Sequence, residues 1–145
     1  MRVNECMTRD VKIAGPNDTI RQAATMMAEC DAGSLPVGDN DRLVGMITDR
    51  DITVRAVAQG KGPDTPVSEA MSGDIRYCFE DDDCDAVLQD MGKLQVRRLP
   101  VLSREKRLIG IVSLGDLATR EGRKDLGAAL KDISRPGGLH SQAAP

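Results

Sequence analysis

The 145-residue chain carries a formal net charge of −3, with 40% hydrophobic and 30% charged residues, a composition typical of a soluble globular protein. No apolar run approaches the roughly 18 residues that span a bilayer, and the start of the chain lacks the hydrophobic core of a signal peptide, so we expect a cytoplasmic protein. The acidic balance gives no general reason to expect nucleic acid or an acidic membrane surface as a partner.

The first predicted elements are an extended piece at residues 11–14 and an amphipathic helix. The apolar residues of that helix follow the spacing of one helical face, and they are Ile20, Ala23, Ala24 and Met27. Two short apolar strands follow, around residues 35–37 and 43–47, with a turn at residues 38–41 between them. A second helix is predicted from about residue 49 to residue 58.

The same elements then recur, because the chain is a tandem repeat. A shift of 64 residues lays Leu35-Pro36-Val37 on Leu99-Pro100-Val101, and a shift of 65 residues lays Asp51 on Asp116. The second copy has its own extended piece at residues 75–79. Its apolar helical face consists of Cys84, Val87, Leu88 and Met91. We interpret the acids that precede each helix, Asp18 and the run 80–83, as stabilising a helix N-terminus.

This order, β-α-β-β-α in each copy, predicts an α/β (α+β) fold in which the two copies pack with pseudo-two-fold symmetry, because each is too small to bury its sheet alone. We predict domains at residues 3–60 and 67–125, a linker at residues 61–66, and a C-terminal helix and tail at residues 126–145. The C-terminal helix is expected from about Lys124 to Ile133.

The four cysteines, Cys6, Cys30, Cys78 and Cys84, form no C-x-x-C pair, and the single histidine lies in the tail. We therefore predict no metal site and interpret the cysteines as reduced thiols at apolar positions. Cys84, for example, stands where the first copy has Ile20.

Each copy contains a hydroxyl residue followed three positions later by aspartate, Thr48 and Asp51 in the first copy and Ser113 and Asp116 in the second. One interpretation is a capping box, in which the two side chains bind each other's backbone N–H groups. The other is a ligand site, because a hydroxyl at a helix N-terminus suits a phosphate and a carboxylate one turn later can accept from two ribose hydroxyls.

The repeated pattern, with its Leu-Pro-Val strand and Gly-x-x-[Thr/Ser]-x-x-Asp motif, resembles a pair of CBS domains (a Bateman module) over residues 3–125. In layout the chain is similar to short bacterial proteins made of two CBS domains. The resemblance implies a cleft ligand with an adenosyl group, such as AMP, ADP, ATP or S-adenosylmethionine. It implies that Asp51 and Asp116 hold the ribose, with Thr48 and Ser113 near ribose or phosphate. The adenine would be bordered by residues of the extended pieces, among them Lys12, Ile13, Arg76 and Tyr77.

The resemblance also implies that residues just before the Leu-Pro-Val strand contact phosphates. Here the copies differ, because the second has Arg97-Arg98 and the first has Gly33-Ser34. We expect unequal sites, with phosphate bound by Arg97 or Arg98. The alternative for these arginines is an exposed basic edge. Arg50 has the same two interpretations, an exposed helical residue or a phosphate contact.

The sequence contains no nucleophile–base pair with an orienting group, no P-loop and no G-x-G-x-x-G motif, so we expect a non-catalytic protein with no required cofactor. The leading hypothesis is a regulatory sensor of an adenine nucleotide that modulates a partner protein. One alternative is a scaffold that has lost ligand binding. Another is a nucleic-acid-binding protein, which is less favoured because the chain has no aromatic platform on which bases could stack. We expect a homodimer, with candidate faces at residues 52–58 and 117–123.

Overall fold

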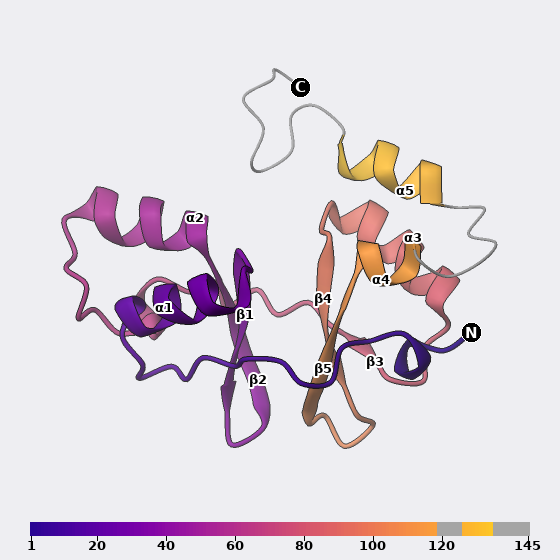
Figure 1. Ribbon diagram of the computed structural model, residues 1–145, viewed down its shortest axis with the longest axis horizontal. Helices are drawn as coiled ribbons and strands as arrows, with labels where there is room; N and C mark the ends of the chain where they lie inside the picture. Colours follow the sequence, from indigo (N-terminus) through magenta and orange to yellow (C-terminus); the bar gives the residue numbers. More distant parts are fainter. Residues whose placement is uncertain (119–125, 135–145) are drawn as a thin grey trace. The chain divides into compact units, whose positions relative to one another are not determined.

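The computed structural model describes residues 1–118 and 126–134. The chain forms two compact units (Figure 1). The first-repeat unit contains Asp10–Arg76 and Glu105–Leu108, and the second-repeat unit contains Met1–Arg9, Tyr77–Arg104 and the described residues from Ile109 onward. The short segment that precedes the first repeat therefore belongs to the unit built by the second repeat. The domain boundaries drawn from the sequence stay predictions.

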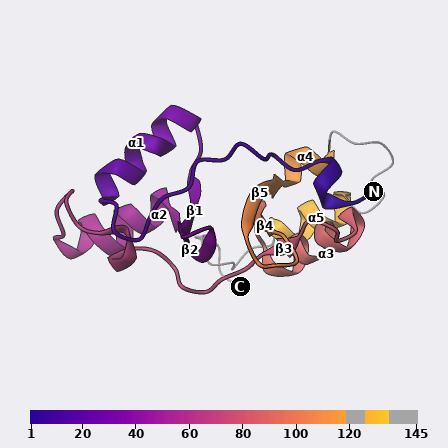
Figure 2. The same ribbon diagram turned by 90° about the horizontal axis from the view of Figure 1, so that it is seen from below.

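The first-repeat unit is an antiparallel hairpin with helices on one face (Figures 1 and 2). Its elements are α1 (Ile20–Cys30), β1 (Ser34–Asp39), β2 (Arg42–Thr48), α2 (Asp49–Asp51), the π-helical turn η2 (Ile52–Ala56) and the 3-10 turns η3 (Val57–Gln59) and η4 (Val67–Glu69). The predicted second helix is thus one α-helical turn continued by η2 and η3. Of the predicted extended piece 11–14, only Ala14 pairs with the sheet, in a parallel bridge to Val37.

Helix α1 begins at a capping box, because the Thr19 hydroxyl accepts from the N–H of Gln22 and the Gln22 side chain accepts from the N–H of Thr19. Ile20, Ala23 and Met27 are buried against the hairpin, as predicted. Ala24 is exposed, so its assignment to the buried stripe was wrong. The buried face is narrower because Ala24 lies about 100° around the helix from Ala23.

The second-repeat unit has a three-stranded sheet in the order β3-β4-β5 with helices on one face. Its elements are η1 (Val3–Glu5), β3 (Cys78–Phe79), α3 (Cys84–Leu94), β4 (Arg98–Leu102), β5 (Leu108–Ser113), α4 (Leu114–Ala118) and α5 (Leu126–Ile133). Cys84, Val87, Leu88 and Met91 are all buried, as predicted. The mixture of helices and small sheets confirms the α+β fold class. The predicted tail and residues 119–123 of a predicted dimer face lie outside the described residues.

The acids before the helices accept hydrogen bonds from the preceding turns or form ion pairs. None of them caps a helix through its side chain, so their interpretation as caps was wrong. Asp18 Oδ2 accepts from the N–H of Gly15, and Asp82 Oδ2 accepts from the N–H of Phe79. Asp83 occupies the N-cap position of α3, but its side chain makes no capping hydrogen bond. These short side chains satisfy nearby backbone donors in the preceding turn, a known alternative to capping.

Each core is completed by a segment that lies before the other repeat in the sequence. Val3 and Cys6 are buried in the second-repeat core, whereas Val67 and Ala70 are buried in the first-repeat core. Thr8 forms an antiparallel bridge to Ile111, with N–H···O distances of 2.8 and 2.9 Å. The corresponding bridge in the first-repeat unit joins Ser72 and Met46.

The motif glycines are required where these segments cross the strands. A Cβ at Gly110 would lie 2.6 Å from the carbonyl oxygen of Thr8, and a Cβ at Gly45 would lie 2.6 Å from that of Ser72. Both distances are far shorter than a carbon–oxygen contact allows. The glycine of the Gly-x-x-[Thr/Ser]-x-x-Asp motif therefore permits the close approach of a crossing backbone.

Candidate functional site

In the first repeat, the motif forms a reciprocal capping box at the end of β2. The Thr48 Oγ1 accepts from the N–H of Asp51 at 3.0 Å, and Asp51 Oδ2 accepts from the N–H of Thr48 at 3.0 Å. Asp51 Oδ1 lies 3.8 Å from Arg55 Nε. The capping interpretation is confirmed, and the Thr48 hydroxyl keeps its own proton to donate because it acts as an acceptor in this box.

The second repeat builds the same turn at the end of β5. Ser113 Oγ accepts from the N–H of Asp116 at 3.0 Å, and Asp116 Oδ2 accepts from the N–H of Ser113 at 2.9 Å. Both residues are partly buried. The two repeats therefore share the same local structure at this motif. Ligand binding by the motif stays a prediction.

The residue before the Leu-Pro-Val strand lies next to this turn in both repeats. In the second, the N–H of Leu114 donates to the carbonyl of Arg97 at 2.8 Å, and in the first, the N–H of Asp49 donates to the carbonyl of Gly33 at 2.9 Å. The backbone of Arg97 is thus fixed beside the Ser113–Asp116 turn. Arg97 and Arg98 are exposed and take part in none of the ion pairs found among the described residues.

In the first repeat, the position equivalent to Arg97 is Gly33, and a negative charge lies beside it. A Cβ at Gly33 would lie 3.0 Å from Asp49 Oδ2, so the carboxylate of Asp49 occupies the space into which a side chain at position 33 would extend. Asp49 Oδ1 also accepts from the N–H of Arg50 at 2.8 Å. Arg97 of the second repeat therefore corresponds to Gly33 of the first, and Leu114 corresponds to the acidic Asp49.

The residues predicted to border adenine are spread along the extended pieces. Lys12 and Ile13 are exposed residues of the first-repeat unit, directly before Ala14. Arg76, in the same unit, donates to Asp74 Oδ2 at 2.9 Å. Tyr77, in the second-repeat unit, packs edge-on against Phe79 with ring centroids 5.5 Å apart. The structure thus brings together Thr48 with Asp51 and Ser113 with Asp116, and it places the backbone of Arg97 against Leu114, the residue that follows Ser113.

Two residues near the motif were not found from the sequence. Asp49 follows Thr48 directly and was treated as part of the predicted helix, although its equivalent in the second copy is leucine. Arg55 lies one turn after Asp51 and also donates to the carbonyl of Met71 at 3.2 Å. The i, i+4 spacing of Asp51 and Arg55 was the available signal for an ion pair.

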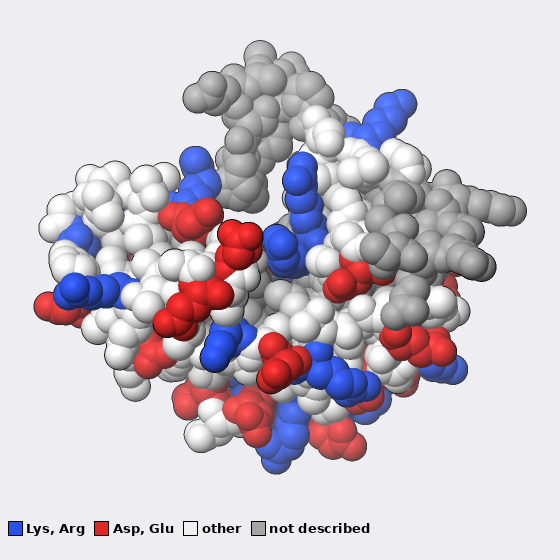
Figure 3. Space-filling view, viewed as in Figure 1, with Lys and Arg blue, Asp and Glu red and all other residues white. Residues whose placement is uncertain are grey.

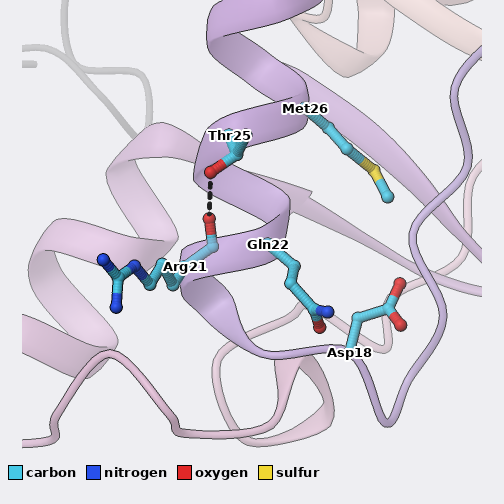
Figure 4. Close-up of a pocket in the computed structure, with 5 residues that line it drawn as sticks. All are labelled: Asp18, Arg21, Gln22, Thr25 and Met26. Carbon is cyan, nitrogen blue, oxygen red and sulfur yellow. Dashed lines mark hydrogen bonds between the residues drawn. The ribbon is translucent and has the colours of Figure 1, made fainter.

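A cavity of about 380 Å³ lies beside α1 and is lined by Asp18, Arg21, Gln22, Thr25 and Met26 (Figure 4). Arg21 and Thr25 are linked within the helix, where the Thr25 hydroxyl donates to the Arg21 carbonyl at 2.9 Å. None of the predicted site residues lines this cavity, which is an open hollow on the surface of the first-repeat unit. Its five lining side chains do not form a set typical of a catalytic or metal-binding site.

Side chains of both signs are interspersed over the face viewed in Figure 3. No helix among residues 1–118 and 126–134 is long and apolar enough to cross a membrane. Within the same ranges, no three His, Cys, Asp or Glu side chains gather in a way that would hold a metal ion.

The duplicated turn and its crossing strand agree with the comparisons with known proteins. The family profile of the CBS domain matches residues 3–57 and again residues 63–121. The chain belongs to the CBS-domain family. This CBS pair is 41% identical over 133 residues to the CBS domain-containing protein YhcV of Bacillus subtilis, and the match covers 91% of this chain and 94% of YhcV.

Solved CBS pairs share the fold. Hypoxic response protein 1 of Mycobacterium tuberculosis is 38% identical over 142 residues, 94% of this chain and 96% of that protein. Hypoxic Response Protein I, in a crystal structure with two coordinated zinc ions, matches with a TM-score of 0.77, at 38% identity over 84% of this chain and 100% of that one. The CBS pair of protein MJ0100, solved in complex with 5′-methylthioadenosine and S-adenosyl-L-methionine, matches with a TM-score of 0.71, at 28% identity over 81% of this chain and 93% of that one.

Proposed function

We propose that this CBS pair is a non-catalytic regulatory module that binds an adenosyl ligand and thereby modulates a partner protein. The observation that supports it most directly is the constellation of the second repeat, where a hydroxyl and a carboxylate share one backbone turn and the backbone of the exposed Arg97 is hydrogen-bonded to that turn. An adenosyl ligand offers a ribose diol for the carboxylate and, in the nucleotides, a phosphate for the guanidinium. The MJ0100 pair, which has the same fold, was solved with two adenosyl ligands.

The two repeats are proposed to differ in ligand. In the second repeat, the backbone of Arg97 lies beside the Ser113–Asp116 turn and Arg98 follows it directly in the chain. Positive charge from either arginine would favour AMP, ADP or ATP. In the first repeat, the carboxylate of Asp49 stands beside Gly33 and would repel a phosphate. That repeat is proposed to bind an adenosyl compound without phosphate, such as S-adenosylmethionine, or no ligand at all.

Calorimetric titration of the nucleotide-free protein with AMP, ADP, ATP, NAD, S-adenosylmethionine and adenosine tests the proposal. We expect saturable binding of at least one adenine nucleotide. Asp116→Ala should abolish it, whereas Arg97→Ala should weaken the nucleotide by about 10- to 150-fold, which corresponds to the 1.5–3 kcal/mol of one hydrogen bond to a charged group. Adenosine binding should be unchanged by Arg97→Ala, because adenosine carries no phosphate.

Arg9→Ala is the matched control, since it removes one exposed positive charge from the same unit at a distant point of the sequence. Equal loss in Arg9→Ala and Arg97→Ala would point to a general charge effect and contradict a phosphate site. If folded wild-type protein binds none of the six compounds, the motif serves only as a helix cap and the scaffold hypothesis takes its place.

The dimer is proposed to form through the motif helix of the first repeat. Val54 and Val57 are 40% and 64% exposed on η2 and η3, an arrangement that leaves two β-branched apolar side chains in water. Val57→Asp should shift the sedimentation coefficient to that of a monomer while circular dichroism stays unchanged. A wild-type protein that sediments as a monomer at micromolar concentration would contradict this part of the proposal.

A further inference from the structure

Three of the four cysteines lie together in the core of the second-repeat unit. Cys6, Cys78 and Cys84 are 7%, 3% and 0% exposed. The Sγ atoms of Cys6 and Cys84 are 3.4 Å apart, although the whole first repeat lies between the two residues in the sequence. Since an S–S bond is about 2.05 Å long, the two sulfurs need only a small side-chain movement to become bonded.

The duplication of the chain provides an internal reference for these positions. Cys6 follows η1 as Ala70 follows η4, and Cys84 opens α3 as Ile20 opens α1. The N–H of Cys84 donates to the carbonyl of Met1 at 2.9 Å, and that of Ile20 donates to the carbonyl of Thr65 at 2.8 Å. Ala70 and Ile20 are buried in the first-repeat core.

The same fold is therefore built in the other repeat without sulfur at either place. Aliphatic side chains satisfy the packing requirement there, so the fold does not require a thiol at either place. The second repeat thus has two thiols in contact at positions where apolar volume is all that the fold needs.

We propose that Cys6 and Cys84 are an oxidation site at which a hydroperoxide converts the thiol pair into an intramolecular disulfide. The Cys6 thiolate attacks one peroxide oxygen, which gives a Cys6 sulfenic acid and releases water or an alcohol once the leaving oxygen takes a proton. The Cys84 thiol then gives up its proton and its sulfur attacks the sulfenic sulfur, so that the S–S bond forms as the sulfenic hydroxyl leaves with that proton as water. Two electrons pass from the two thiols to the peroxide.

Cys6 is assigned as the first residue oxidised because it is the more exposed of the pair. Cys78 is the less suited neighbour, because burial, followed by the charges of Asp82 and Asp90, raises the pKa of its thiol to about 12. The nucleophile in this chemistry is the thiolate, and Cys78 stays protonated.

The disulfide would tether the segment Met1–Arg9 to the first residue of α3. That segment is held at present by backbone hydrogen bonds, among them Val3 N–H to the Asp82 carbonyl at 3.0 Å and Asn4 N–H to the Glu80 carbonyl at 2.9 Å. A short segment attached to a unit by a few backbone hydrogen bonds can open locally while the rest of the unit stays folded. Oxidation would therefore suppress that opening and hold the segment in place.

The test treats the reduced full-length protein with hydrogen peroxide, blocks remaining thiols with iodoacetamide, and maps the product by mass spectrometry. Digestion with trypsin and a protease that cleaves after Glu80 places Cys6, Cys78 and Cys84 in separate peptides. We expect a Cys6–Cys84 cross-link that dithiothreitol reverses, and a melting temperature several degrees higher for the oxidised than for the reduced protein.

Cys6→Ala and Cys84→Ile install the residues that the other repeat uses, so both variants should fold, and both should lose the cross-link and the rise in melting temperature. Cys30→Ser, which changes an exposed cysteine, should keep both. A cross-link through Cys78 or Cys30, or only sulfinic and sulfonic products on Cys6, would overturn the proposal. So would the absence of any Cys6–Cys84 product in folded protein treated with excess peroxide.

Discussion

Gly110→Ala tests whether the crossing of the Met1–Arg9 segment over β5 determines the identity of the motif glycine. The added methyl would lie 2.6 Å from the Thr8 carbonyl oxygen and 3.2 Å from Met7 Sδ. The sulfur can move, but the Thr8 backbone is fixed by its two hydrogen bonds to Ile111. The crossing segment must therefore be displaced.

The cost can be estimated from these contacts. Overpacking of this kind costs about 1–3 kcal/mol, and weakening two backbone hydrogen bonds adds about 0.5–1.5 kcal/mol for each that is lost. A loss of about 3 kcal/mol in the free energy of unfolding is expected. For a chain of this length, that corresponds to a melting temperature about 10 °C lower.

Urea denaturation followed by circular dichroism measures the change, with Gly73→Ala as the control. A Cβ at Gly73 would meet no atom within 4 Å, so this substitution should alter the free energy of unfolding by less than about 0.5 kcal/mol. Gly45→Ala should behave like Gly110→Ala. If Gly110→Ala were as harmless as Gly73→Ala, the close backbone crossing would not be the reason for the glycine.

Three further changes have defined outcomes. Ser113→Ala removes the acceptor of the capping box and should lower the free energy of unfolding by about 1 kcal/mol in urea titrations, whereas Ser113→Thr should retain most of it. The hydrogen bond from Arg104 lowers the pKa of Asp81 from its ordinary 3.8. The extra stability of the wild type over Asp81→Asn should therefore be present at pH 7 and be lost as the pH falls below 3.8. Melting temperatures measured across this pH range check it. At pH 8, iodoacetamide should label exposed Cys30 in the folded protein, while Cys78, with its pKa raised to about 12, should react only after unfolding, as peptide mass spectrometry would record.

Each of these outcomes can fail in a specific way. Equal stability of Ser113→Ala and the wild type would mean that the capping hydrogen bonds contribute nothing in solution. A wild-type advantage over Asp81→Asn that is the same at neutral and at acidic pH would show that the Asp81 charge is not its source. Rapid labelling of Cys78 in the folded protein would show that the second-repeat core is more open than its burial indicates.

The repeat, the order of elements and the capping boxes could be predicted from the sequence because each depends on local patterns. The i, i+3, i+4 spacing placed Met27 and Met91 in their cores, and the Ser-x-x-Asp spacing identified the box at Ser113. The acids at positions 18 and 82 were assigned wrongly because a short carboxylate can satisfy either a helix end or the preceding turn, and only the backbone geometry decides between them.

Other features depend on contacts between distant parts of the chain. The carboxylate of Asp49 beside Gly33 joins residues separated by the whole hairpin, and the sequence does not state that they meet. The same holds for the contact of Cys6 with Cys84. The comparison of the two copies marks one residue of each contact, because Gly33 and Cys84 are positions at which one repeat departs from the other. It does not indicate which residue each of them meets.

The exchange of leading segments bears on how a duplicated gene can fold. Val67 fills the first-repeat core although it comes before the second repeat, and Val3 fills the second-repeat core although it comes before the first. The first-repeat unit is nearly one continuous stretch, Asp10–Arg76 with Glu105–Leu108, whereas the second-repeat unit combines Met1–Arg9 with residues from Tyr77 onward. A fragment that ends before Val67 would therefore lack part of the first-repeat core, and a fragment that begins after Arg9 would lack part of the second-repeat core.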